Sequence, residues 1–209
     1  MIRNLKKSIW AQIFVIYTRY LIGGTFVFAS LIKIKGMRFT SESGEDNPID
    51  SAWHLFETLY ASGLYWQFIG VCQLIAGLLL MTQRYAKLGA VVFFPIILNI
   101  FVITLSYYFA YTPVITGLLL LANIMLLLWD WDQLKVLLNF RSELTSARRI
   151  EDDWVWSLTG LLLFAFTFGY RLLVDRYDLF LWLIISTSIG LIAFFVGLYR
   201  HRRSGRSQL

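Results

Sequence analysis

Residues 10–32 read WAQIFVIYTRYLIGGTFVFASLI, an apolar run long enough to cross the hydrocarbon core of a bilayer as one helix. Its only charged residue is Arg19, near the middle of the run. An ionisable side chain at that depth is expensive unless it turns inward and finds partners. Because Arg19 interrupts the apolar core and no small-residue cleavage pattern follows, we expect a retained span and not a cleaved signal.

Five more apolar runs follow, and the six together predict an all-α integral membrane protein with six transmembrane helices. Hydrophobic residues make up 58% of the 209 residues and charged residues 15%, whereas a soluble domain carries about 25% charge. The runs are continuous and lack the alternation of a membrane β-barrel. The predicted spans are 10–32, 64–81, 88–109, 114–129, 154–173 and 179–199.

Polar residues divide the six spans into two groups. The first four each carry an amide or a charge deep in the apolar run, namely Arg19, Gln73, Asn99 and Asn123. The last two carry only hydroxyls at comparable depth. We therefore expect a four-helix bundle over 1–138 and a two-helix extension over 154–199. The remaining segments are expected to be a linker over 139–153 and a basic tail over 200–209.

Lys and Arg predict the orientation. Thirteen of the 19 fall on the side of both termini, which the positive-inside rule makes cytoplasmic. This distribution explains the net charge of +6 without nucleic acid. The expected surroundings are a lipid bilayer, and the expected location is a bacterial inner membrane. Outside, residues 52–60 are too short to span and predict an interfacial helix, while 132–140 predict an amphipathic helix on the cytoplasmic side.

The deep polar residues have two readings. Asn and Gln often hydrogen-bond between membrane helices, with small residues such as Gly70 and Gly77 allowing close approach. Alternatively, Gln73, Asn99 and Asn123 form one layer that contacts a ligand. Arg19 needs a carboxylate, carbonyls or water, and we expect it to reach toward the cytoplasmic face and meet Asp130. Such a bridge is compatible with either a structural or a functional role.

A second cluster is expected at the outer face. Lys33 ends the first span there, and His54 and Glu57 are i, i+3 neighbours on the interfacial helix. A titratable pair beside a lysine could move protons or hold an anionic or quinone-like head group, whereas the alternative is an ordinary interfacial belt. No metal site is expected, because His54 and His201 fall on opposite predicted sides.

The sequence resembles DoxX-like membrane proteins over residues 10–138. The similar positions are Arg19, the glycines after it and Lys33 in residues 17–33; Gln73, Gly77 and Arg84 in residues 70–87; residues 90–99; and the pair Trp129-Asp130. The resemblance implies a four-helix bundle, a redox partner subunit and, in some relatives, a place in thiosulfate:quinone oxidoreductases. The chain departs from the pattern, since Gln73 stands where many relatives have Glu, and Cys72 is its only cysteine.

Three functional hypotheses remain open at this point. The first is a membrane subunit of a quinone-linked oxidoreductase, with His54 and Glu57 near the outer mouth of a site lined by Arg19, Lys33, Gln73 and Asn99. The second is a non-catalytic carrier of a small solute, motivated by the buried Arg19. The third is a membrane scaffold or assembly protein. The residues do not decide whether the chain is an enzyme, and quinone enters as a cofactor only through the resemblance.

Overall fold

The described residues fold mostly into helices. The computed structural model describes residues 5–141, 149–174 and 178–206, with side chains described as far as residue 203. In chain order the elements are α2 (Ile9–Ile34), α3 (Ala52–Ala61), α4 (Leu64–Met81), α5 (Ala86–Ser106), α6 (Thr112–Trp129), α7 (Trp131–Leu134), η1 (Lys135–Leu138), η2 (Ile150–Asp152), α8 (Trp154–Leu173) and α9 (Leu179–Arg206). Helices α2, α4, α5, α6, α8 and α9 are long and apolar enough to cross a membrane. Within the described ranges there is no strand, so the predicted six-span, all-α fold class is confirmed.

Local sequence signals set several helix boundaries. The Ser51 side chain accepts a hydrogen bond from the backbone N–H of His54 and caps α3, and Asp153 does the same for Val155 at the start of α8. Pro113 lies in the first turn of α6, where its missing N–H costs nothing. These caps place the short connections between spans close to where the apolar runs predict them.

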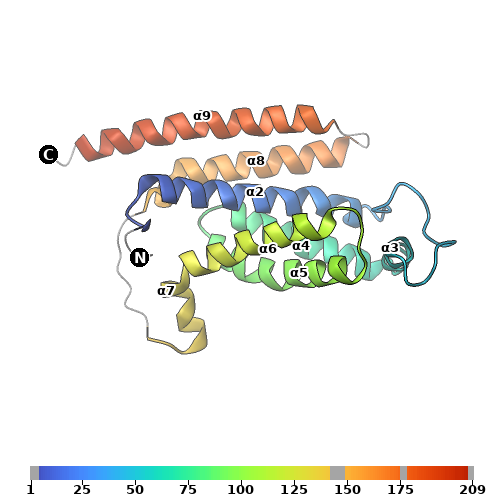
Figure 1. The fold of residues 1–209 in the computed structure, drawn as a ribbon. Helices are drawn as coiled ribbons and strands as arrows, with labels where there is room; N and C mark the ends of the chain where they lie inside the picture. The colour runs from blue at the N-terminus through green and yellow to red at the C-terminus, as the bar shows by residue number, and fades with distance from the viewer. Residues whose placement is uncertain (1–4, 142–148, 175–177, 207–209) are drawn as a thin grey trace.

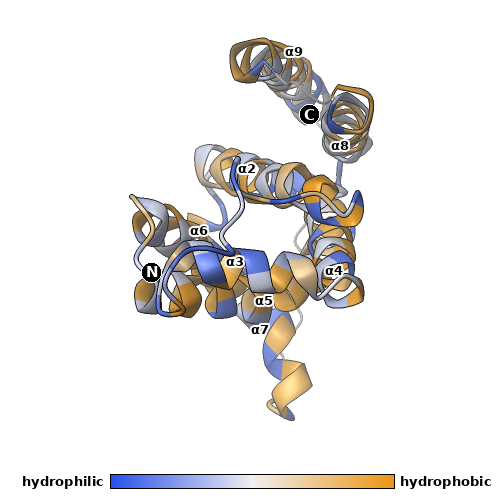
Figure 2. Cartoon of the chain, turned by 90° about the vertical axis from the view of Figure 1, so that its right-hand side faces the viewer, coloured by the Kyte–Doolittle hydropathy of each residue, from blue (hydrophilic) through white to orange (hydrophobic). Residues whose placement is uncertain are grey.

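Helices α2, α4, α5 and α6 surround a common interior, α8 lies against α2, and α9 is outermost (Figure 1, Figure 2). Two apolar cores share α2. In the first, Phe26 of α2 stacks on Phe93 of α5 with ring centroids 3.7 Å apart. In the second, Ile16 and Tyr20 of α2 meet Trp156 of α8. In the most apolar 18-residue stretch of each helix, 67% of α2 is buried but only 11% of α9. Helix α2 is therefore the central helix of the molecule.

Small residues bring α2 and α4 together, as the sequence predicts. A Cβ atom at Gly77 would lie 2.7 Å from the carbonyl oxygen of Gly23, and one at Gly23 would lie 3.0 Å from that of Gly77. A Cβ at Gly70 would likewise lie 2.9 Å from the carbonyl oxygen of Ser30. The two backbones therefore approach too closely for larger residues at these positions.

Three predicted boundaries need correction. The helix expected at 132–140 is instead the short α7 followed by η1, after which Asn139 adopts a left-handed φ of 62°. The 139–153 linker contains η2. The expected tail at 200–209 is helical as far as Arg206. An apolar run marks where hydrocarbon ends, but arginines are good helix formers and carry the helix beyond it.

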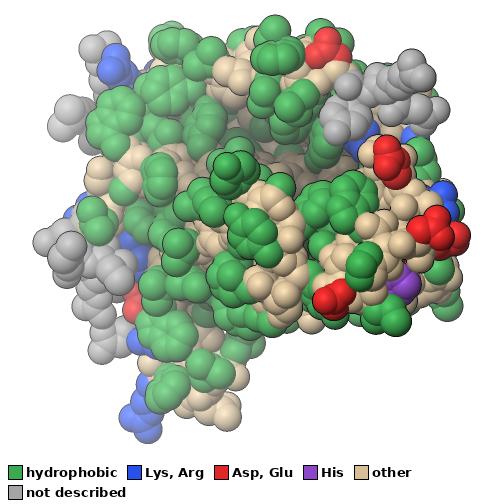
Figure 3. All heavy atoms as spheres, turned by 45° about the vertical axis from the view of Figure 1, so that its right-hand side comes forward, with side chains coloured by type: hydrophobic (Ala, Val, Ile, Leu, Met, Phe, Trp, Pro, Cys, Tyr) green, Lys and Arg blue, Asp and Glu red, His purple; other side chains and the backbone are tan. Residues whose placement is uncertain are grey.

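The two ends of the molecule differ. The start of α2, the α4–α5 turn, α7 and the end of α9 lie at one end, which we call the α7 end, and α3 lies at the other, the α3 end (Figure 1). Between them, hydrophobic side chains cover much of the lateral surface (Figure 3), including Leu118, which is 62% exposed, and Phe180, which is 77% exposed. Such a surface suits contact with lipid tails.

Candidate functional site

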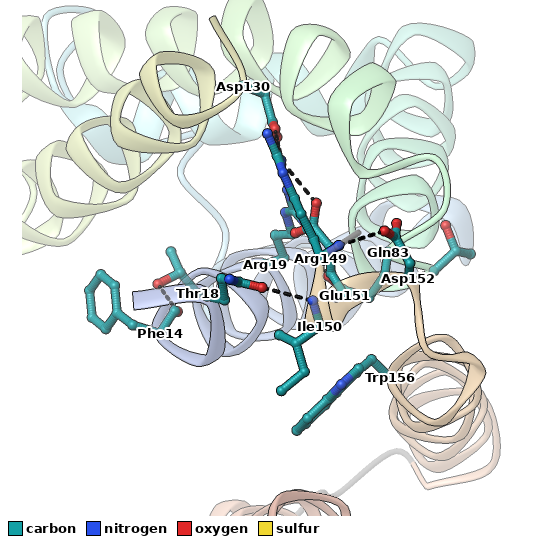
Figure 4. A network of polar contacts seen from close by, with 12 residues as sticks. Phe14, Thr18, Arg19, Gln83, Asp130, Arg149, Ile150, Glu151, Asp152 and Trp156 are labelled. Atoms are coloured by element: carbon teal, nitrogen blue, oxygen red, sulfur yellow. Dashed lines mark hydrogen bonds and ion pairs between the residues drawn. The ribbon is translucent and has the colours of Figure 1, made fainter. Parts of the chain in front are cut away.

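Two buried cations of α2 define the polar interior, and the first is Arg19. Its side chain is 1% exposed. One terminal nitrogen, Nη2, donates to Asp130 Oδ2 at 2.8 Å, where α6 ends. The other, Nη1, donates to Glu151 Oε2 at 2.6 Å and to Gln83 Oε1 at 3.0 Å. Arg19 thus joins α2 to α6, to η2 and to the α4–α5 turn (Figure 4).

Arg149 completes the charge balance. Its Nη1 donates to Asp130 Oδ1 at 2.8 Å and to Glu151 Oε1 at 3.1 Å, so each carboxylate receives both guanidinium groups (Figure 4). Burial alone would lower the pKa of Arg149, but hydrogen bonds and charge from Asp130 and Glu151 outweigh it and raise that pKa. We call the five residues Arg19, Gln83, Asp130, Arg149 and Glu151 the Arg19 network. It holds two positive and two negative charges and is neutral as a unit.

Further hydrogen bonds fasten η2 to the start of α2. Gln12 accepts from the backbone N–H of Ile150 at 2.7 Å and donates to the carbonyl of Lys6 at 2.8 Å. Lys6 in turn pairs with Asp132 of α7 at 3.0 Å. The segment before α8 is therefore held against the four-helix bundle by charged and uncharged contacts together. The two C-terminal spans are docked on the bundle through this segment as well as through α2.

The predicted contact between Arg19 and Asp130 is confirmed, but three members of the network were missed. Arg149 and Glu151 lie in the stretch treated as a linker, and Gln83 lies in the tight α4–α5 turn. One signal was present in the sequence. The acidic run 151–153 stands directly before a span, on the side toward which Arg19 was expected to reach. Gln83 carried no such signal, because its placement depends on a backbone φ of 59° in the turn.

Lys33, near the end of α2, is the second buried cation and has different surroundings. It is 7% exposed, and its Nζ donates to the carbonyl of Ala29 at 3.0 Å. The same atom lies 5.0 Å from the centroid of the Trp66 ring and 5.5 Å from that of Phe39. Across the described ranges no carboxylate forms an ion pair with it. Aromatic faces and one carbonyl therefore take the place of a counter-ion.

Neighbouring residues shape this surrounding, which we call the Lys33 niche and define as Lys33, Phe39, Trp66 and Gly70. Trp66 is held by its indole N–H, which donates to the carbonyl of Met37 at 3.0 Å. Gly70 leaves room for the lysine stem, since a Cβ there would lie 2.8 Å from Cβ of Lys33. An ammonium group has three N–H bonds to donate, and a single carbonyl accepts only one of them well. The niche thus retains hydrogen-bonding capacity for a ligand oxygen.

Glu57 does not form the expected titratable pair with His54. Both its oxygens accept from the guanidinium of Arg38, at 2.9–3.0 Å, and Oε2 also accepts from the backbone N–H of Gly44 at 3.1 Å. The hydrogen bonds from Arg38, then that from Gly44, hold the pKa of Glu57 below its ordinary value. A carboxylate kept ionised in this way fastens the loop after α2 and is a poor proton carrier. Arg38 was missed because it lies in a polar loop without periodicity.

The three amides do not form one layer. Asn123 is fully buried and donates to the carbonyl of Ala90 at 3.2 Å, which links α6 to α5 as interhelical glue would. Gln73 is 2% exposed, and its Oε1 has no partner among the described residues. Asn99, expected to line the site, instead lies on the exposed face of α5. The reason is that α5 packs through Phe93, Ile97 and their neighbours, on the opposite side of the helix.

These features define the class of protein. Six apolar helices and a lipid-compatible lateral surface make the chain an integral membrane protein whose environment is a lipid bilayer. In the described parts of the chain, no group of three or more His, Cys, Asp or Glu is placed to hold a metal ion.

Comparison with known proteins adds one relative. The chain is 35% identical over 99 residues to the uncharacterized protein YwoB of Bacillus subtilis (strain 168). The match covers 47% of this chain and 60% of that protein, so the chain spans well under the full length of this curated relative. No family model matches the sequence, and no solved structure matches it.

Proposed function

We propose that the chain is a DoxX-like membrane subunit of a quinone-linked oxidoreductase and that the Lys33 niche binds the quinone head group. The observation that carries the proposal is the buried Lys33 ammonium. It has one carbonyl and two aromatic faces around it and pairs with no carboxylate of the described residues. The sequence resemblance over residues 10–138 supplies the quinone, and the niche supplies the place for it.

The chemistry of the niche suits such a ligand. A quinone carbonyl accepts hydrogen bonds, and Lys33 has N–H bonds to donate. Trp66 and Phe39 offer flat apolar surfaces to a ring. Lys33 also lies in the last turn of α2, where the helix dipole favours a cation. A bound quinone would accept electrons, which a redox partner subunit would deliver.

The Arg19 network supports a structural role for Arg19, the other buried cation of α2. Its two guanidinium groups already meet two carboxylates, so no positive charge is left over for an anionic solute. A carrier that binds its substrate at Arg19 gains no support from this arrangement. Because the charges of the Arg19 network are matched and the Lys33 ammonium has further N–H bonds to donate, we assign binding to Lys33.

A binding measurement tests the proposal directly. Purified protein in nanodiscs would be titrated with short-tailed ubiquinone and menaquinone analogues by calorimetry, and co-purified lipids would be searched for quinones by mass spectrometry. Lys33→Met removes the donor and keeps the length of the side chain. We expect it to weaken binding by about tenfold or more, the size expected when a charged hydrogen bond is lost.

Lys87→Met is the matched control, because it makes the same change at the α7 end. It should leave the affinity unchanged. Wild-type protein that binds neither analogue and carries no quinone would overturn the proposal, as would equal affinity in the Lys33→Met variant. Preferential binding of a carboxylate or phosphate over the analogues would also reject quinone as the ligand.

The proposed setting is a bacterial inner membrane with the α7 end in the cytoplasm, supported by the excess of Lys and Arg at that end. Single cysteines on a Cys72→Ser background test it. Asp46→Cys in the loop before α3 should react with an impermeant maleimide in intact cells, and Arg202→Cys near the end of α9 should not. The reverse labelling would invert the orientation.

A further inference from the structure

Asn99 presents a carboxamide to the outside of the molecule from within a membrane span. It lies on the exposed face of α5, seven residues before the helix ends at Ser106. At 1.5 Å per residue this is about 10 Å inside the end of the span. The asparagine side chain is too short to reach the interface from there. Among the described residues it has no hydrogen-bond partner.

Three exposed hydroxyl side chains on the spans, by contrast, form hydrogen bonds within their own helices. The hydroxyl of Thr25 donates to the carbonyl of Leu21 at 2.7 Å. Those of Ser106 and Ser188 donate to carbonyls four residues earlier, at 3.0 and 2.7 Å. A hydroxyl can do this because it lies close to its own backbone. A carboxamide has two donors and an acceptor, and leaving them unmade in hydrocarbon is costly.

The stripe around Asn99 is built for another helix. Pro95, Asn99, Val102 and Ser106 are all exposed and follow one another at intervals of three or four residues. None of these side chains is large, so a second helix can approach the backbone closely. Pro95 lacks an N–H, and the carbonyl of Val91 therefore loses its usual donor within α5. Both features place unmet polar groups on the same helix.

We propose that this stripe, Pro95, Asn99, Val102 and Ser106, is a dimer interface between two copies of the chain. A carboxamide is complementary to itself, because each copy can donate through Nδ2 and accept through Oδ1. Around a two-fold axis near Asn99, one pair of side chains satisfies both molecules. A foreign helix would need its own matching polar group at the same depth. The interface does not involve the Lys33 niche, so it stands independently of the proposed function.

Dilution in lipid tests the dimer. Full-length protein labelled with donor and acceptor dyes would be reconstituted over a wide range of protein-to-lipid ratios, and energy transfer would give the dimer dissociation constant. Asn99→Leu should raise that constant by about tenfold, as expected for an interhelical polar contact in lipid. Asn99→Gln should keep the dissociation constant much closer to the wild-type value, because the carboxamide is retained. Thr25→Leu, at an exposed but self-bonded hydroxyl, is the matched control and should have no effect.

Cross-linking gives a second readout that does not depend on affinity. On a Cys72→Ser background, Asn99→Cys should form a disulfide dimer in native membranes with a mild oxidant. Leu118→Cys on the exposed face of α6 should not. A wild-type protein that stays monomeric at every ratio would overturn the proposal, as would unchanged association in Asn99→Leu. Cross-linking of residue 99 to a different protein would reject the second copy as the occupant.

Discussion

Arg19 and Lys33 are both buried on α2, fourteen residues or about 21 Å apart, yet their positive charges are stabilised in opposite ways. Arg19 is surrounded by two carboxylates, an amide oxygen and a second arginine. Lys33 has a backbone carbonyl and two aromatic rings. The planar guanidinium can bridge several acceptors at once, whereas the ammonium is a compact donor that a ring face can tolerate.

The difference separates architecture from binding. In a low-dielectric interior, desolvation of charges is offset only when geometry and hydrogen bonding are good, and the Arg19 network meets that condition. Removing one charged member of the Arg19 network would leave the others uncompensated, so the network holds the helices in place. Removing Lys33 would leave no partner charge unpaired among the described residues. In the wild type, its ammonium has further N–H bonds that it can donate to a ligand.

The largest effect is expected for Arg19→Met. Asp130 and Glu151 would then share only Arg149, which leaves a net negative charge buried. Breaking a buried pair from one side typically costs about 3–5 kcal/mol. The measurement is the free energy of unfolding in mixed micelles, titrated with SDS. If the Arg19 network acts as a unit, adding Asp130→Asn to Arg19→Met should cost less than the sum of the two single losses.

A similar but smaller loss is expected for Asp130→Asn, compared with Asp132→Asn nearby. Asp130 is 3% exposed and accepts hydrogen bonds from both arginines. Replacing it with the neutral Asn should therefore lower the free energy of unfolding by about 3 kcal/mol. Asp132 is 39% exposed and pairs with Lys6 in contact with solvent, so its loss should stay below about 1 kcal/mol. Equal losses for the two variants would mean that burial does not make the Arg19 network special.

The same contrast shows what could be foreseen from the sequence. Continuous apolar runs define the spans, and Asp130 is an acidic residue where the fourth span ends, so its pairing with Arg19 was predictable. Arg149 and Glu151 lie 130 and 132 residues from Arg19 along the chain, and apart from the acidic run 151–153 no local pattern indicates that contact. The companion error concerns Asn99. Helix α5 is apolar all round, so its periodicity hardly indicates which face is buried.

Lys33→Met should behave unlike Arg19→Met. The substitution removes a buried cation that pairs with no carboxylate among the described residues. It loses the hydrogen bond to the carbonyl of Ala29 and the aromatic contacts, the latter worth about 0.5–2 kcal/mol. Relief of desolvation offsets that loss, so the free energy of unfolding should change by less than about 1 kcal/mol in either direction. The same SDS titration applies. A loss as large as that of Arg19→Met would erase the distinction between the two cations and make Lys33 structural.

The smallest effect concerns the loop beside the Lys33 niche and depends on pH. Because Arg38 lowers the pKa of Glu57 in the folded protein, Glu57 contributes stability above the ordinary value of about 4.3, and the contribution is lost as pH falls through the lowered value. Hydrogen exchange at the Gly44 amide, which donates to Glu57, reports this contact. After correction for intrinsic rates, the protection of this amide in the wild type should decrease at pH values below about 4. In Glu57→Gln, protection should be low throughout and flat with pH. A wild-type profile as flat as that of the variant would show that Phe39 and the rest of the loop are held over Lys33 by packing alone.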